Sequence, residues 1–234
     1  MNTVETHDIY VIIPAFNEQN GVCNVLAEIP NKLVSEIIIV NNGSTDNTVE
    51  QAISCGATVL DEPRKGYGFA CLKGIDYLKT KPINGSDIVV FIDADHSDYP
   101  AEMTKLVEPI KLDQADLVIG SRALGNMEKG SMTPQQIFGN WLATNLLKLF
   151  YKVTFTDLGP FRAIRFDQLL KIKMVDKTYG WTVEMQLKAA KSGLRCAEVP
   201  ANYRRRIGKS KVSGTVRGTI MAGYKIIWTI FKYL

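Results

Sequence analysis

Hydrophobic and polar positions along the first half of the chain follow two alternating patterns. Five apolar runs of strand length occur, at 8–16, 35–42, 57–62, 87–95 and 115–122. Stretches with helical spacing lie between them, at 18–30, 45–56, 66–80 and 100–110. Continuous runs of Ile and Val that alternate with helices are typical of a parallel sheet covered on both faces. The pattern therefore predicts an α/β fold with a mostly parallel, Rossmann-like sheet and helices on both faces.

The second half of the chain is less regular. It predicts a loop, a long helix, a short strand, a helix, a strand and a last helix, at 125–134, 134–152, 155–167, 179–193, 194–206 and 214–234. With 234 residues, 46% of them hydrophobic, the chain can bury a full core in one domain. No uncharged apolar run reaches the roughly 18 residues of a spanning helix, and the acidic N-terminus does not resemble a secretory signal. The four scattered cysteines predict reduced thiols.

Polar sequences follow four of the predicted strands. They read PAFNE, NNGSTD, DADHSD and GSR. Because ligands of an open parallel sheet bind beyond the carboxyl ends of its strands, we expect these segments to form one site. Asp93, Asp95 and Asp98 crowd three negative charges together, which indicates a cation among them. Mg²⁺ and Mn²⁺ prefer such carboxylates, and the alternative is a solvated turn.

Other common chemistries find little support. The chain has two histidines and neither a G-x-S-x-G nor a Walker A pattern, so hydrolase triads, zinc sites and P-loops are disfavoured. The sequence GYGFAC at 66–71 lacks the third glycine of a dinucleotide fingerprint. Residues 195–234 carry a net charge of +8, whereas the preceding 194 residues carry −4. This asymmetry indicates an anionic partner for the C-terminal part.

Seven segments in order resemble glycosyltransferase family 2, and within it the polyprenyl- or dolichyl-phosphate sugar synthases. They are VIIPAFNE, IIIVNNGSTDNT, GYGFACLKGI, FIDADHSDYP, VIGSR, DLGPFRAI and GKSK, between about residues 8 and 213. The resemblance implies a GT-A fold, a nucleotide-sugar donor, a divalent metal (Mg²⁺ or Mn²⁺) and inversion at the anomeric carbon. It implies a lipid-phosphate acceptor and no nucleic-acid partner.

The same resemblance implies roles for individual residues. The residues expected to bind the nucleotide-sugar are Pro14, Asn17, Glu18, Asn41, Asn42, Gly66, Asp93, Arg122 and Lys211. Asp93 and Asp95 match the metal-binding Asp-x-Asp. Asp157 and Arg162 match the acceptor loop, and Arg205 matches the Arg of the R-x-x-G-x-S-K segment. The expected catalytic residues are Asp95, Asp157, Glu184 and Arg205.

Two segments depart from the family pattern. Asn41 and Asn42 stand where the family usually has at least one acid, and Ser97 stands where a Gln often follows the Asp-x-Asp. An Asn amide can pair bidentately with uracil, whereas the adjacent N–H donors of guanine suit a carboxylate. The Asn pair therefore favours a UDP-sugar over a GDP-sugar. The alternative is that both Asn residues only shape the turn. With Ser97 at this position, the sequence does not identify the second protein ligand of the metal.

Three further features allow two interpretations each. Glu184 is either a general base or acceptor contact, or a helix-face acid paired with Lys188 four residues later. The basic run 203–211 is expected to form a lid over phosphates, and the alternative is a solvated surface. Trp141 and Trp228 are expected to be packing residues rather than sugar platforms.

The acceptor decides whether a base is needed. A lipid phosphate, with a second pKa of roughly 6, is already an anionic nucleophile at neutral pH. An alcohol acceptor would require a carboxylate base, for which Glu184 and Asp157 are the candidates. We therefore expect transfer of a hexose to polyprenyl phosphate. The alternatives are a glycosyltransferase with a soluble or saccharide acceptor and a disabled binding module.

The chain is expected to have three functional parts. Residues 1–122 form a nucleotide-sugar-binding half, residues 123–213 an acceptor-binding half of the same domain, and residues 214–234 an amphipathic helix. Its apolar stripe (Ile220, Tyr224 and Phe231 among others) and nearby basic residues predict peripheral contact with the cytoplasmic face of a membrane. The rest of the chain is expected to fold without this helix. The alternative is a core helix or a homodimer surface.

Overall fold

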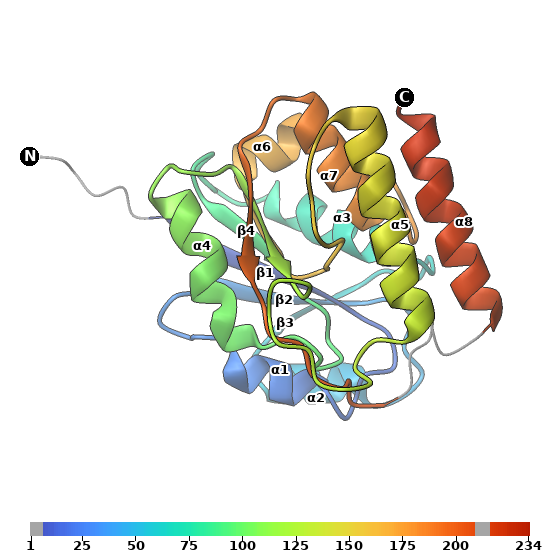
Figure 1. Ribbon diagram of the computed structural model, residues 1–234. Coiled ribbons are helices and arrows are strands. Elements are labelled where there is room, and N and C mark those ends of the chain that lie inside the picture. Colours follow the sequence, from blue (N-terminus) through green and yellow to red (C-terminus); the bar gives the residue numbers. More distant parts are fainter. Residues whose placement is uncertain (1–6, 209–215) are drawn as a thin grey trace, which may run out of the picture.

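The computed structural model describes residues 7–208 and 216–234 (Figure 1). Within them one seven-stranded sheet contains β1 (Ile9–Ala15), β2 (Glu36–Asn41), β3 (Thr58–Asp61), β4 (Ile88–Phe91), β5 (Leu117–Ser121), β6 (Arg162–Arg165) and β7 (Cys196–Pro200). The order across the sheet is β3-β2-β1-β4-β6-β5-β7. Neighbouring strands are parallel except at β6, which runs antiparallel to β4 and β5. The expected mostly parallel sheet is confirmed, and the direction of β6 is the difference.

Helices cover both faces of the sheet, as predicted. They are α1 (Val22–Glu28), α2 (Thr48–Ser54), α3 (Tyr67–Leu78), α4 (Met103–Lys111, after the 3₁₀ turn η1, Pro100–Glu102), α5 (Pro134–Tyr151), α6 (Phe166–Lys171), α7 (Trp181–Lys191) and α8 (Val216–Lys232). The face that carries α1, α2 and α4 encloses one buried cluster. The face that carries α3, α5, α6 and α7 encloses the other. The central strands β4 and β5 are buried between these two layers, which explains their continuous apolar runs.

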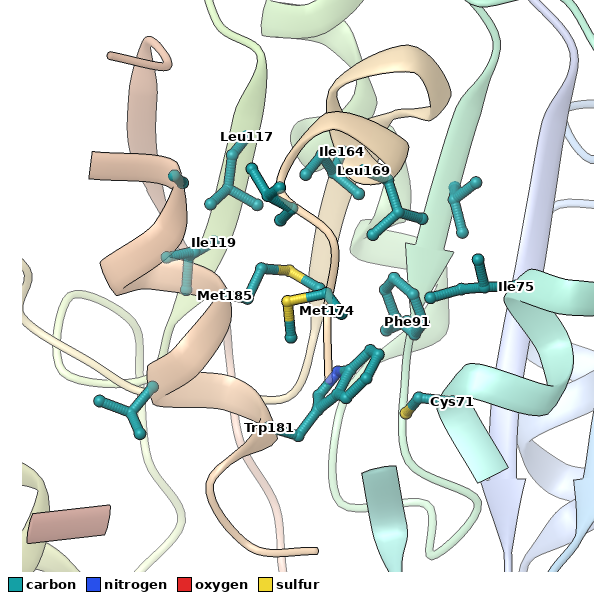
Figure 2. Packing of buried hydrophobic residues seen from close by; sticks show 14 of the residues in the cluster. Cys71, Ile75, Phe91, Leu117, Ile119, Ile164, Leu169, Met174, Trp181 and Met185 are labelled. Carbon is teal, nitrogen blue, oxygen red and sulfur yellow. The ribbon is translucent and has the colours of Figure 1, made fainter. Parts of the chain in front are cut away.

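The larger cluster fixes the start of α7 (Figure 2). Phe91 of β4 meets Trp181 of α7 edge to face, with ring centres 5.9 Å apart. Met174 and Met185 lie close by, on the side toward Ile119 of β5. Aromatic pairs of this kind add to the stabilisation from burial. Because Trp181 is the first residue of α7, its burial also positions the loop that precedes the helix.

The start of α5 follows from the sequence Thr-Pro-Gln-Gln at 133–136. The side chain of Thr133 accepts a hydrogen bond from the backbone N–H of Gln136 (3.3 Å), and Gln136 Oε1 accepts one from the N–H of Thr133 (2.8 Å). Pro134 occupies the first helical position, where no N–H is needed. This capping box begins α5 where the sequence pattern predicts it.

The last helix, α8, has one face on the body and one face exposed. Ile230 is fully buried, and Tyr151 of α5 donates its hydroxyl hydrogen to the Ile230 carbonyl (2.6 Å). Lys225 forms an ion pair with Asp176 (3.1 Å). Ile220, Tyr224 and Phe231 are exposed, as the predicted stripe requires. Because α8 completes the core, the expectation that the rest of the chain folds without it is not supported.

Cysteine pairing differs from the prediction. Cys23 of α1 and Cys55 after α2 form a disulfide, with Cα atoms 5.9 Å apart, because α1 and α2 pack side by side. The expectation of reduced thiols is wrong for this pair and holds for Cys71 and Cys196. Across the described part of the chain, no helix combines the length and apolar character that crossing a bilayer requires.

Candidate active site

A pocket lies at the carboxyl ends of β1, β2 and β4. Its walls are formed by Pro14, Ala15, Phe16, Glu18, Asn42, Lys65, Gly66, Tyr67, Asp93, Ala94, Asp95, Tyr179 and Arg206. Three of the four polar strand ends therefore meet as the sequence predicts. The fourth, which contains Arg122 after β5, does not line the pocket. Tyr179 and Arg206 come from the second half of the chain, so the pocket draws on both predicted halves.

Asp95 is held in place by its neighbours. Its Oδ1 accepts hydrogen bonds from the backbone N–H (2.9 Å) and the hydroxyl of Ser97, which is itself buried. Its Oδ2 faces Arg206 Nη1 at 3.1 Å. Ser97 therefore orients a carboxylate, and this is the role that the structure gives to the residue that departs from the family pattern.

One carboxylate oxygen of Asp93 lacks such partners. This oxygen, Oδ1, is buried, and no described residue donates a hydrogen bond to it. Burial, followed by the charge of Asp95, raises the pKa of Asp93 above its usual range. A buried carboxylate oxygen without a donor beside a second carboxylate is the arrangement that a cation stabilises.

The donor set fits Mg²⁺ or Mn²⁺ on the condition that the substrate supplies further ligands. Among the described residues, no three His, Cys, Asp or Glu side chains are grouped closely enough to hold a metal ion. Mg²⁺ is usually bound through one or two carboxylates together with substrate phosphates. Asp93 and Asp95 would be those carboxylates.

Two cations face this acidic end of the pocket. Arg206 pairs with Glu18 (2.8 Å) as well as with Asp95. Lys65 lies over the Phe16 ring, 5.3 Å from its centre, and both residues line the pocket. Motif matching pointed to Arg205 instead of Arg206. The signal that could have separated them is side-chain alternation, because adjacent residues of an extended segment point to opposite sides.

Arg205 points away from the pocket. Its side chain is exposed and donates to the Lys129 carbonyl (2.9 Å) near Glu128. The proposed catalytic role of Arg205 is therefore not supported by its position. Lys211 lies outside the described residues, so its predicted role stays a prediction.

Asn42 uses its side-chain amide for hydrogen bonds that stabilise the wall of the pocket. Its Nδ2 donates to the carbonyls of Glu62 (2.9 Å) and Arg64 (2.8 Å), and its Oδ1 accepts from the N–H of Gly66 (2.7 Å). Both of its donor hydrogens are therefore occupied, and bidentate pairing with uracil would break these bonds. Gly66 has φ 147°, a conformation open to glycine.

Asn41 and Asn17 also shape turns. Asn41 donates to Asp61 (2.8 Å) and accepts from the N–H of Ser44 (2.9 Å), and it does not line the pocket. Asn17, with φ 55°, accepts from the N–H of Thr45 (2.7 Å) and links β1 to the turn after β2. The structure thus supports the alternative that the Asn pair builds the turn, and it does not support pairing of Asn42 with uracil.

Arg122 and Asp157 form a buried pair outside the pocket. Asp157 accepts from the backbone N–H, Nε and Nη2 of Arg122 at 2.8, 2.7 and 2.6 Å. Asp98 lies near this pair, buried, with both carboxylate oxygens unpartnered among the described residues. The adjacent Arg162 is fully buried and donates to the carbonyls of Gly159 and Thr182. It therefore stabilises the loop that precedes β6. Asp157 does not line the pocket and its carboxylate is paired with Arg122, so a role as base stays a prediction.

Glu184 is a fully buried structural acid. It pairs with Lys188 (2.9 Å), the i+4 alternative, and accepts from the N–H groups of Val175 (3.1 Å) and Asp176 (2.7 Å). These bonds fix the loop whose Tyr179 lines the pocket. These contacts favour the alternative of a helix-face acid paired with Lys188, and a catalytic role for Glu184 stays a prediction.

The sequence also matches known proteins over most of its length. Residues 10–172 match the description Glycosyl transferase family 2. An uncharacterized glycosyltransferase of Mycobacterium tuberculosis is 36% identical over 92% of this chain and 94% of its own length. The UDP-N-acetylglucosamine–dolichyl-phosphate N-acetylglucosaminyltransferase of Methanococcus voltae is 31% identical over 95% of this chain and 94% of its own length.

Solved structures share the architecture. The crystal structure of glucosyl-3-phosphoglycerate synthase from M. tuberculosis with Mn²⁺, UDP-glucose and phosphoglyceric acid aligns with a TM-score of 0.74 at 23% identity. The alignment covers 97% of this chain and 79% of that chain. At this identity the likeness concerns the fold. Together the sequence matches and the shared architecture show that the chain has the GT-A fold and belongs to glycosyltransferase family 2.

Proposed function

We propose that this glycosyltransferase transfers a hexose, with inversion, from a UDP-sugar to a polyprenyl phosphate. The proposal rests on which carboxylates line the pocket and which are paired with cations elsewhere. Asp93 and Asp95 line the pocket, whereas Asp157 and Glu184 do not line it and are paired with Arg122 and Lys188, respectively. The two candidate bases for an alcohol acceptor are thus held away from the pocket. An acceptor that is already ionised needs neither.

The donor site is assembled from residues of opposite charge. In this proposal the nucleoside lies against Pro14, Asn42 and Gly66, and the diphosphate lies between Lys65 and Arg206. A divalent metal held by Asp93 and Asp95 would neutralise the negative charge that develops on the leaving diphosphate. Arg206 exchanges its carboxylate partners for phosphate oxygens, and Arg–phosphate pairs are strong and directional.

The named relatives support the donor and acceptor classes. The M. voltae relative carries UDP-N-acetylglucosamine and dolichyl phosphate in its name, and it matches nearly the whole chain. The structure that shares the fold contains UDP-glucose and Mn²⁺. These likenesses replace the Asn pair as support for UDP. With such an acceptor, we further propose peripheral association with the cytoplasmic face of a membrane.

The test is a donor screen with mass spectrometry of the product. The full chain is incubated with Mn²⁺ and either UDP- or GDP-hexoses, with polyprenyl phosphate, a free saccharide or a small phosphorylated acid as acceptor. We expect a polyprenyl-phosphate hexose in the organic phase, formed from a UDP-sugar. A product confined to the aqueous phase would establish a soluble acceptor, faster turnover of GDP-sugars would overturn the donor assignment, and no turnover with any pair would support a disabled site.

A further inference from the structure

Helices α5 and α8 lie side by side (Figure 1). Both helices carry large apolar side chains that are exposed to solvent. These residues, here called the α5–α8 face, are Ile137, Phe138, Trp141, Leu149 and Phe150 of α5 and Ile220, Met221, Tyr224, Trp228 and Phe231 of α8. Phe150 and Phe231 join the two helices, with ring centres 5.5 Å apart. Contiguous apolar surface of this kind marks a contact site. The expectation that Trp141 and Trp228 pack inside is wrong, because they are 58% and 52% exposed.

Packing within the chain does not account for this face. α8 already uses Ile226, Ile230 and Tyr233 against the body, and α5 uses Ala143 and Leu147. Both helices are therefore apolar on two sides. A helix that is apolar on its solvent side as well as on its core side lacks a partner there.

The charges of these helices are all of one sign. Residues 134–152 and 216–234 contain no Asp or Glu, whereas each of the other α-helices contains at least one. Their charged side chains include Lys148, Lys152, Lys225 and Lys232. Of these, Lys148, Lys152 and Lys232 are exposed, and no carboxylate in the described ranges pairs with them. An apolar face flanked by unopposed lysines is complementary to an anionic lipid surface.

Chain connectivity places this face next to the pocket. α5 follows the loop that leaves the carboxyl end of β5, and α8 follows Arg206 within ten residues. Lys225 of α8 also pairs with Asp176, in the loop that carries Tyr179. A surface bound at the first turns of both helices would therefore lie beside the entrance for an acceptor.

We infer that the α5–α8 face docks on the surface of an anionic bilayer, with Trp141 and Trp228 at the level of the headgroups. A second copy of the chain is the less suitable occupant, because a twofold contact would bring the lysines of both copies together. Docking by this face does not depend on the proposed function, since it would also hold for a water-soluble acceptor.

Tryptophan fluorescence gives the most direct test. The chain has three Trp residues, and Trp181 is only 1% exposed, so Trp141 and Trp228 dominate any response to added lipid. Vesicles of phosphatidylglycerol and phosphatidylcholine should shift the emission to shorter wavelength, and brominated acyl chains should quench it. Pure phosphatidylcholine vesicles should give a much smaller response. Unchanged emission with anionic vesicles at low salt would overturn the inference.

Flotation of matched variants identifies the face. Trp141→Gln with Trp228→Gln should lower the vesicle-bound fraction more than tenfold, whereas Ile53→Gln with Leu112→Gln, equally exposed on other elements, should not change it. Lys148→Gln with Lys232→Gln should weaken binding roughly 25-fold, at about fivefold per lysine. Lys32→Gln with Lys111→Gln serves as the control for charge.

Two results would overturn the inference by a different route. One is equal loss of binding in the control variants, which would indicate nonspecific adsorption. The other is a dimer by light scattering that the Trp variants convert to a monomer without any change in vesicle binding. Because none of these readouts uses sugar transfer, failure of docking is distinguishable from failure of the proposed function.

Discussion

Arg206 forms an ion pair with Asp95 in the lining of the pocket, with Nη1 3.1 Å from Oδ2. The same guanidinium bonds Glu18 at 2.8 Å. A cation thus stands among the carboxylates that follow β4, as their like charges require. If Asp93 and Asp95 hold a divalent metal, as proposed, Arg206 would be left to bind the phosphates of the donor. Arg206 is therefore a candidate donor-binding residue that the sequence motif did not single out.

Replacing Arg206 should weaken donor binding. We expect Arg206→Gln to raise the Kd for UDP in the presence of Mn²⁺ by roughly 10- to 100-fold, because hydrogen bonds to charged groups contribute about 1.5–3 kcal/mol. Isothermal calorimetry measures this directly. Arg205→Gln is the matched control, since its side chain points to Lys129, and it should change the Kd by less than about twofold. The reverse order of effects would restore the role expected for Arg205.

Gly66 and Gly139 should respond oppositely to alanine. A Cβ on Gly66 would lie 2.3 Å from the Lys177 carbonyl oxygen, at φ 147°, whereas one on Gly139 meets nothing within 4 Å. Gly66→Ala should cost about 1–3 kcal/mol or more of stability and weaken UDP binding, because the residue forms the pocket wall. Gly139→Ala, inside α5, should stabilise by up to about 1 kcal/mol. Urea denaturation compares them, and a neutral Gly66→Ala would contradict the packing described.

Asp98 should make the folded state less stable as the pH rises. Burial, followed by the charge of Asp93, raises the pKa of Asp98 well above its ordinary value. A carboxyl with a raised folded-state pKa binds more protons when folded, so stability falls as the pH rises from the unfolded pKa of about 3.9 through the folded pKa. Asp98→Asn removes this titration. In EDTA, the free energy of unfolding of Asp98→Asn minus that of the wild type should increase from pH 5 to pH 8. A difference that stays constant or falls over this range would contradict a buried carboxyl without a partner.

Glu184 should matter for stability more than for chemistry. It is fully buried, pairs with Lys188 at 2.9 Å and accepts two backbone N–H groups. Removing one partner of a buried pair costs about 3–5 kcal/mol, so Glu184→Ala should lower the free energy of unfolding by that amount. Glu108→Ala, at an exposed position of α4, should change it little. If Glu184→Ala unfolds normally but loses kcat at all pH values, Glu184 is catalytic after all.

The strands could be predicted because their side chains are buried on both faces. Runs such as Ile37–Ile38–Ile39–Val40 leave little choice of element, and their polar ends mark the sheet edge. The direction of β6 could not be predicted, since a four-residue strand carries no information about its neighbours. The short helix α6 follows β6 directly, and the sequence pattern did not predict it as a separate helix.

The site residues at the ends of strands could be predicted from the sequence. Pairings between residues far apart in the sequence could not. Asp93, Asp95, Glu18 and Gly66 line the pocket as expected. The partnership of Asp157 with Arg122, 35 residues away, has no local signature. The disulfide between Cys23 and Cys55 likewise depends on how α1 and α2 pack.

The most direct test of the account is transfer of radiolabelled hexose from UDP-hexose to polyprenyl phosphate, counted in the organic phase. Wild-type enzyme and Asp95→Ala are compared with Mn²⁺ and with EDTA. We expect metal-dependent transfer by the wild type and a kcat lower by a factor on the order of 10²–10³ in the variant, the loss expected for one important electrostatic contact in the transition state. Undiminished transfer by Asp95→Ala, or full activity of the wild type in EDTA, would contradict this expectation.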